Sequence, residues 1–145
     1  MTDNRDLKTL AELANDEDAE VREYVAKNPS TPKEVLAKLA NDEEKSVRLG
    51  VAENPSTSTE VLVELAKYKI TSMRRRVASN PSTPIAVLTR LAKDKDAKVR
   101  KAVASNPSTP KEVYIKLAKE KKIRRVRTGV FWLIFFAALL VWAIG

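Results

Sequence analysis

The side chains that most often perform chemistry are either missing from this chain or confined to repeated positions. The 145 residues include no His and no Cys, which excludes a thiol nucleophile, an imidazole base and the usual thiolate or imidazole metal sites. Ser recurs after Asn-Pro, but no base is near it in sequence, so we expect it in turns and not in nucleophilic attack. The sequence therefore predicts a protein that is not an enzyme and uses no cofactor or metal.

Arginine and asparagine each recur at one position of a repeated pattern. The arginines could bind phosphates, or each could pair with an acid six residues earlier, such as Asp16, Asp42 or Asp94, or in the neighbouring unit. The asparagine amides could satisfy carbonyls at a helix end and in the following turn. Because recurrence in every unit is what stacking requires, we interpret both rows as structural ladders. Their members are Arg22, Arg48, Arg74, Arg100, Asn28, Asn54, Asn80 and Asn106.

Internal repetition defines the elements that carry these residues. Asn-Pro-Ser recurs every 26 residues, which gives complete units at 5–30, 31–56, 57–82 and 83–108 and a partial fifth from 109. Each unit reads as two short helices. Residues 31–34 predict a capping box with Pro32 at the first helical position, and the second helix must end near Asn54 because a proline follows. One unit cannot bury its apolar face, so the sequence predicts an all-α, right-handed α-solenoid of stacked units.

The repeated pattern resembles a known family. VREYVAKNPSTPKEVLAKLA, residues 21–40, is similar to the leucine-rich repeat variant (LRV) family and, more loosely, to HEAT repeats. The resemblance covers about residues 5–130 and recurs four times in register. It implies a superhelix in which an α-helix alternates with a second, often 3₁₀-like helix, and a role in scaffolding or binding. Some relatives carry a cysteine-rich iron-sulfur module, which this cysteine-free chain cannot hold.

Charge is divided between the two halves of the repeat region. Residues 1–64 carry 8 basic and 15 acidic side chains, a net charge of −7, and residues 65–127 carry 19 and 4, a net charge of +15. The asymmetry suggests that the basic half meets an anionic surface, either phospholipid or nucleic acid. Two repeat positions change from acidic to basic along the chain and indicate a candidate partner surface, for which the alternative is ordinary solvated helix surface. Its residues are Lys69, Arg75, Arg76, Lys95 and Lys98.

The C-terminal segment, residues 128–145, carries no charged side chain. As a helix it would span roughly 27 Å, close to the hydrocarbon thickness of a bilayer, so we predict a single transmembrane helix; the alternative is a buried core helix. The expected anchor residues are Phe131, Trp132, Phe135, Phe136 and Trp142.

A basic segment, residues 119–127, precedes the predicted anchor. Positive flanks favour the cytoplasmic side, and the chain starts without a signal peptide, so we expect the solenoid, residues 1–118, in the cytoplasm. The cations could contact anionic lipid or could only set the orientation of the helix. The lipid-contact candidates are Lys119, Lys121, Lys122, Arg124, Arg125 and Arg127.

These features together predict a membrane-anchored, non-catalytic scaffold for protein–protein interaction, as a small accessory or adaptor subunit of a larger membrane complex. A repeat surface supplies area and charge but no convergent pair of titratable groups. The alternative function is binding of nucleic acid or anionic lipid by the basic half. Nucleic acid is the less expected partner, because the basic region has few aromatic side chains on which bases could stack.

Overall fold

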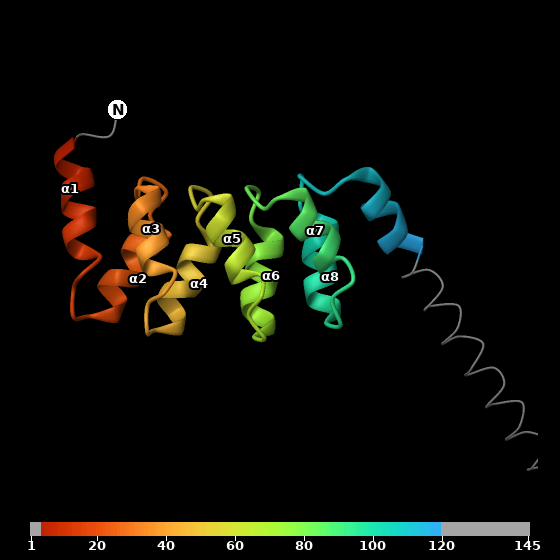
Figure 1. Cartoon of the computed structure of the whole chain (residues 1–145), viewed down its shortest axis with the longest axis horizontal. Coiled ribbons are helices and arrows are strands. Elements are labelled where there is room, and N and C mark those ends of the chain that lie inside the picture. The colour runs from red at the N-terminus through yellow and green to blue at the C-terminus, as the bar shows by residue number, and fades with distance from the viewer. Residues whose placement is uncertain (1–3, 120–145) are drawn as a thin grey trace, which may run out of the picture. The chain divides into compact units, whose positions relative to one another are not determined.

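The computed structural model describes residues 4–119, and every regular element within them is an α-helix (Figure 1). The described residues up to Pro110 form one compact unit, and residues 111–119, which are helical, belong to a second. The helices of the first unit are α1 (Asn4–Leu13), α2 (Ala19–Lys27), α3 (Lys33–Leu39), α4 (Lys45–Glu53), α5 (Thr59–Leu65), α6 (Thr71–Ser79), α7 (Ile85–Leu91) and α8 (Ala97–Ser105). This all-helical arrangement agrees with the predicted α-solenoid.

The helix pairs follow one another along the first unit in two layers (Figure 1). Helices α1, α3, α5 and α7 form one layer, and α2, α4, α6 and α8 form the other. Neighbouring helices of the second layer contact one another along the stack, whereas those of the first layer make few contacts among themselves. We call the exposed side of α2, α4, α6 and α8 the inner face. All four are nine-residue α-helices and not the 3₁₀-like helices that the family resemblance implies.

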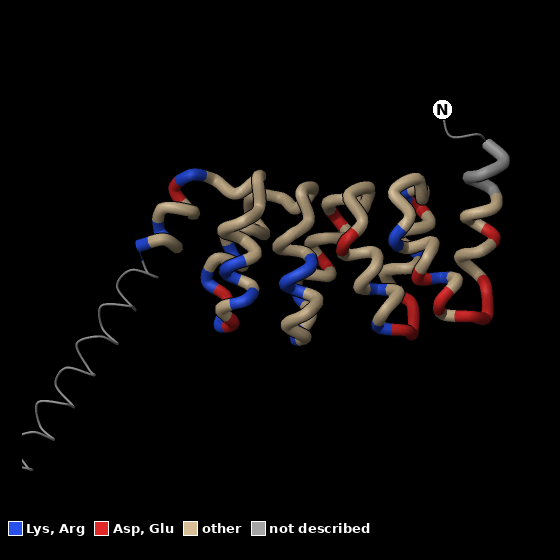
Figure 2. The backbone as a smooth tube through the Cα atoms, turned by 180° about the vertical axis from the view of Figure 1, so that it is seen from behind, with Lys and Arg blue, Asp and Glu red and all other residues tan. Residues whose placement is uncertain are grey.

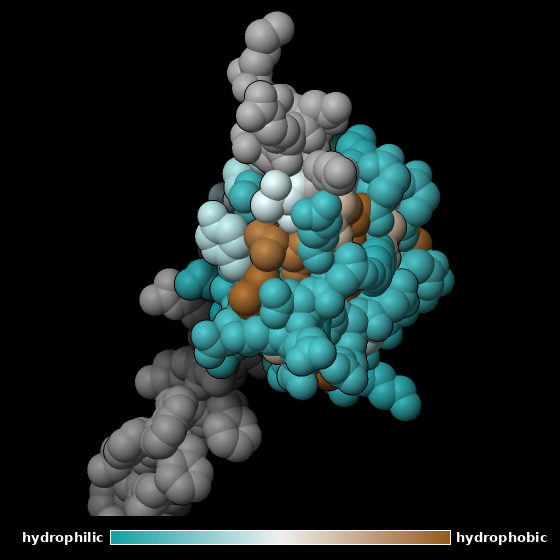
Figure 3. All heavy atoms as spheres, turned by 90° about the vertical axis from the view of Figure 1, so that its left-hand side faces the viewer, coloured by the Kyte–Doolittle hydropathy of each residue, from teal (hydrophilic) through white to brown (hydrophobic). Residues whose placement is uncertain are grey.

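Small aliphatic side chains fill the space between the layers. Leu36 and Leu39 of α3 and Val47 and Val51 of α4 are at most 1% exposed, and the matching residues of the later repeats are buried too. Burying one such side chain stabilises the fold by about 1.5–3 kcal/mol relative to leaving it exposed. The surface seen from the N-terminal end is mainly hydrophilic, with a small apolar area (Figure 3). The core of the first unit is therefore built mainly from these aliphatic side chains.

The starts of α3, α5 and α7 differ from the predicted capping box. Helix α3 begins at Lys33, after Pro32, and no side chain caps it. Thr31 is buried, and its hydroxyl donates to the carbonyl of Val25 at 2.6 Å. The prediction that Thr31 caps α3 was wrong, because this hydroxyl bonds the end of the preceding helix instead. The same bond recurs at Thr57, Thr83 and Thr109.

From the second repeat onward, the asparagine joins its repeat to the one before it. Asn54 Nδ2 donates to the carbonyl oxygens of Ala26 and Asn28, both at 2.8 Å, and its Oδ1 accepts the backbone N–H of Ser56 at 2.9 Å. The acceptors end the previous helix pair, whose terminal carbonyls would otherwise lack partners. Asn80 and Asn106 repeat this pattern. These side chains are thus committed to the stack.

The junction between α4 and α6 is less well satisfied than the others. Three buried side-chain atoms lack a hydrogen-bond partner within residues 4–119, and all belong to this junction: Arg48 Nε, Ser72 Oγ and Arg76 Nε. Buried polar atoms without partners are uncommon in folded proteins, and each costs about 1–3 kcal/mol. We therefore expect the α4–α6 junction to be the weakest of the three between second-layer helices.

Differences between repeats explain two of these unpaired atoms. Arg22 pairs with Asp42 and Arg74 pairs with Asp94. Tyr68 occupies the equivalent position beside Arg48, and the Cζ of Arg48 lies 5.8 Å from the centre of its ring. Because Tyr68 has no carboxylate, the Nε of Arg48 lacks the acceptor that the other two arginines have.

The hydroxyl of Ser72 is unpaired because its partner position changes. In the preceding repeat Ser46 bonds Glu23. Leu49 occupies the position equivalent to Glu23, so Ser72 has no such acceptor.

Replacing Tyr68 with Asp should strengthen this junction. A carboxylate at position 68 restores the acceptor that Asp42 and Asp94 provide elsewhere, and we expect the free energy of unfolding to rise by about 1 kcal/mol. Urea denaturation followed by circular dichroism measures the change. Tyr24→Asp serves as the control, because Tyr24 is 65% exposed and its replacement should be nearly neutral. A less stable Tyr68→Asp variant would show that the aromatic contact outweighs the missing ion pair.

Candidate partner-binding surface

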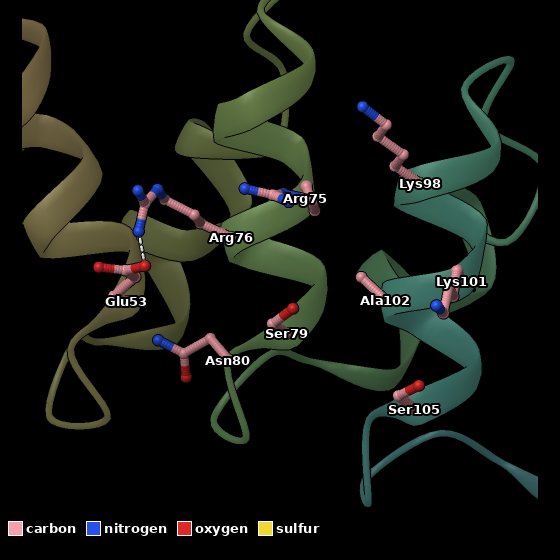
Figure 4. Close-up of a pocket in the computed structure, with 9 residues that line it drawn as sticks. All are labelled: Glu53, Arg75, Arg76, Ser79, Asn80, Lys98, Lys101, Ala102 and Ser105. Carbon is pink, nitrogen blue, oxygen red and sulfur yellow. Dashed lines mark ion pairs between the residues drawn. The ribbon is translucent and has the colours of Figure 1, made fainter.

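An open groove of about 570 Å³ lies on the inner face between α6 and α8 (Figure 4). Side chains three, four or seven residues apart share one face of a helix, and this spacing brings the lining residues of each helix together. The polar residues that α6 and α8 contribute are Arg75, Arg76, Ser79, Lys98, Lys101 and Ser105. Glu53 of α4 lies at the edge of the same groove.

Three of the four cations in the groove form no ion pair with any residue of the described range 4–119. Arg76 forms an ion pair with Glu53 and turns towards α4 (Figure 4). The side chains of Arg75, Lys98 and Lys101 are exposed and form no ion pair within the part of the chain that the structure describes. Lys98 extends from α8 towards α6 (Figure 4). The groove therefore presents free positive charge that could attract an anionic group.

The absence of a side chain at Gly50 lets α4 pack closely against α2. Helix α6 has a long side chain at the equivalent position and cannot pack against α4 in the same way. A Cβ on Gly50 would lie 3.0 Å from the Cβ of Ala26 and 3.3 Å from the Cγ of Lys27. The equivalent residue on α6 is Arg76, a long side chain in the place where α4 has none. Its ion pair with Glu53 is partly exposed, at 28% and 43%, and we expect it to add little stability.

Charge changes along the inner face from α2 to α8. Glu20 and Glu23 lie on α2, and the ammonium of Lys27 bonds Glu23 and holds the pKa of that carboxyl below its usual value. Helix α4 adds Leu49 and the paired Glu53, so the middle of the face is close to neutral. The backbone view also shows acidic residues gathered in the turns of the first repeats (Figure 2). The inner face is thus acidic at one end and basic at the other.

The structure brings together three of the five residues predicted for a partner surface. Arg75, Arg76 and Lys98 line the groove. Lys69 and Lys95 lie in the turns before α6 and α8, outside the groove, and their backbone carbonyls accept bonds from Arg74 and Arg100 at 2.6 and 2.9 Å.

Sequence reasoning missed Lys101, Ser79 and Ser105. Lys101 occupies the repeat position of Leu49 and Arg75, so comparing that position between units would have found it. The two serines stand at the position of Glu53 and carry no comparable signal, because a serine on a helix surface is common.

The recurring arginines lie within the stack. Arg22 donates from Nε and Nη2 to the carboxylate of Asp42 at 2.7 and 3.1 Å, and from Nη1 to the carbonyls of Asp16 and Glu17. Arg74 makes the equivalent bonds to Asp94. Both arginines are at most 9% exposed. Since their donors are used within the stack, in part by an aspartate of the next repeat, these two residues do not present a phosphate-binding row.

The carboxylate partners of Arg22 and Arg74 also differ from the first of the two predicted options, an acid six residues earlier. The acid six residues earlier contributes only its backbone carbonyl, as Asp42 does to Arg48. Its carboxylate accepts the N–H of Glu44 at 2.8 Å and contacts the arginine of the preceding repeat. The pairing within one unit was therefore wrong, and the pairing between neighbouring units is the one that occurs.

The remaining predicted residues lie outside what the structure describes. The anchor at 128–145 and the basic residues after Lys119 are beyond residues 4–119, and Lys119 itself is exposed on a helix. Among residues 4–119, none of the helices has both the length and the apolar character needed to cross a bilayer. Within the same range no three acidic, His or Cys side chains cluster as a metal site would require.

Comparison with known proteins agrees with the repeat pattern. The leucine rich repeat variant family model matches residues 19–44. The matched stretch is one repeat long and runs from the first residue of α2 through α3 to the turn before α4. No curated protein and no solved structure gives a significant match to the chain. The similarity and the repeated helical fold together suggest a scaffold for protein interaction.

Acid should destabilise the stack through two carboxyls. The guanidinium of Arg22 lowers the pKa of Asp42, and that of Arg74 lowers the pKa of Asp94. Because the folded-state pKa lies below the unfolded one, the stabilisation is complete above about pH 5 and falls as the pH drops through the folded-state value. We expect the double variant Asp42→Asn with Asp94→Asn to have a free energy of unfolding about 2–4 kcal/mol lower at pH 7. Between about pH 5 and 2 its free energy of unfolding should fall less steeply than that of the parent.

Urea denaturation at a series of pH values measures this effect. Glu34→Gln, which removes an exposed carboxylate of α3, is the control and should leave the pH dependence as it is in the parent. An unchanged acid limb in the double variant would contradict the assignment to the two ion pairs.

Proposed function

We propose that this protein is a membrane-anchored, non-catalytic scaffold that binds another protein through the inner face of its solenoid. The observation that carries the proposal is the set of free cations at the α6–α8 groove, Arg75, Lys98 and Lys101. The polar residues that recur in each repeat are bonded inside the stack, whereas these three differ between repeats and face solvent. Side chains that are exposed, charged and not needed for stacking are available for a partner.

Binding fits the arrangement of polar groups better than catalysis. An active site needs titratable groups that converge on one reacting atom. The groove instead holds separated cations, two serines and one paired acid. Such a surface can recognise the charge and shape of a partner, which is how repeat stacks are generally used.

Membrane attachment is supported by the sequence that follows the solenoid. Residues 128–145 carry no charge, and residues 119–127 carry six basic side chains and one acidic one. A basic flank followed by an apolar segment is typical of a membrane helix whose charged side stays in the cytoplasm. We therefore propose that the solenoid lies on the cytoplasmic side, where its basic flank contacts anionic lipid, and that the protein is a small accessory or adaptor subunit of a larger membrane complex.

The membrane anchor can be tested by extraction. The full chain should sediment with membranes and stay there after alkaline washing, because a transmembrane helix is not released by changes of charge. A chain shortened at Arg127 should remain helical and soluble without detergent. Equal solubility of both chains would reject the anchor.

The binding face can be tested by photo-crosslinking in native membranes. A photoreactive phenylalanine at Ser79 or Ser105 of the inner face should give a discrete protein adduct. The same residue at Lys33 or Thr59 on the first-layer helices should give none, although these positions are also exposed. Adducts from Lys33 and Thr59 alone would place the partner on the other layer, and no adduct at any position would reject the scaffold.

A further inference from the structure

We infer that the inner face selects a protein segment whose own charge is graded, with an acidic end that binds the α6–α8 groove and a basic end that lies over α2. This inference rests on the protein-binding function proposed above and specifies the chemistry of the partner.

The groove requires more than one negative charge from its occupant. Arg75 projects from α6, and Lys98 and Lys101 project from α8. Packed helices lie roughly 10 Å apart, so the three cations surround the groove from two sides. A single carboxylate would reach one side only, whereas a short run of acidic residues can contact both. A volume of about 570 Å³ is sufficient for several side chains of such a run.

The two serines of the groove add to its polar character. Ser79 and Ser105 line it from α6 and α8, and both are exposed. Their hydroxyls can donate hydrogen bonds to carboxylates or to a peptide backbone. They provide directional contacts that the flexible cations lack.

The rest of the inner face restricts which anions can bind. On α4, Glu53 faces the groove edge and is already paired with Arg76. On α2, Glu20 is exposed and Glu23 is paired with Lys27. A segment that continues from the groove along the inner face therefore passes a neutral middle and reaches an acidic end. It gains complementary contacts at both ends only if its charge changes sign.

A uniformly negative partner fits this surface less well. Nucleic acid and anionic membranes carry negative charge throughout, so the part that extends over α2 would meet Glu20 and lose affinity. The residues that line the groove also include no aromatic side chain on which a base could stack. The graded surface thus favours a protein segment over nucleic acid or lipid.

Binding of synthetic peptides to the full chain in non-ionic detergent tests the inference. One fluorescent peptide carries a Glu block, an Ala block and a Lys block in that order, and its isomer has the same composition with Glu and Lys alternating. Fluorescence anisotropy at low salt, about 50 mM, keeps the electrostatic contribution measurable. We expect the block peptide to bind at least about tenfold more tightly than the isomer.

Two charge-reversal variants identify the site. Arg75→Glu with Lys101→Glu should weaken binding of the block peptide by at least about tenfold. Arg90→Glu with Lys93→Glu makes the same change of net charge in α7 and the turn after it, and should change affinity by less than about twofold. All four residues are exposed, so both variants should keep the circular dichroism spectrum of the parent.

Several results would overturn the inference. Equal affinity for the two isomers would show that the protein does not distinguish the order of charges in the peptide. An equal loss of affinity in the two variants would show that only the net charge of the protein matters. Tighter binding of an oligothymidine, or of the water-soluble short-chain lipid dihexanoyl phosphatidylserine, that is lost in Arg75→Glu with Lys101→Glu would assign the groove to phosphate-bearing partners.

The crosslinking experiment separates this inference from the function on which it rests. If adducts from Ser79 and Ser105 form but the block peptide does not bind, the graded partner is rejected and the protein-binding function stands. If neither adducts nor peptide binding are found, both are rejected.

Discussion

The structure depends on carbonyl groups that no repeat can satisfy alone. Each second-layer helix ends before a proline, which leaves its last carbonyls without helical donors. The amide of the next asparagine, as at Asn54 and Asn80, supplies two donors to that end. Threonine and serine hydroxyls supply further donors at the same corner. Stacking is therefore imposed by polar groups as well as by the apolar core, and this fixes the register of neighbouring repeats.

As a consequence, recurring and variable positions have different roles: the recurring ones stabilise the stack, and the variable ones are available for binding. Recurring residues such as Asn80, Thr57 and Arg74 are buried and bonded within the stack, so they have little capacity for a ligand. Variable positions on the inner face, such as Arg75 and Lys101, are exposed and free of ion pairs within residues 4–119. Because these positions do not hold the stack together, their charge can change from repeat to repeat without loss of the fold.

The sequence was sufficient for the features that are local or periodic. The spacing of Asn-Pro-Ser identified the units, and the proline marked the end of each second helix. The sequence was not sufficient where a side chain has two possible hydrogen-bond partners nearby. Thr31 could cap the following helix or bond the preceding one, and Asp42 could pair within its unit or with Arg22 before it. Only the three-dimensional approach of neighbouring repeats decides between them.

Among the second-layer helices of residues 4–119, the least satisfied interface lies where the acidic half meets the basic half. In an array whose members contact only their neighbours, stability is the sum of separate interfaces, and the weakest one opens first. Here that interface separates α1–α4 from α5–α8. The protein would then separate into two blocks of opposite charge, each still internally folded. Small rotations at the α4–α6 junction would also change the distance between the acidic and basic ends of the inner face. This junction would then set the length of partner segment that can contact both ends.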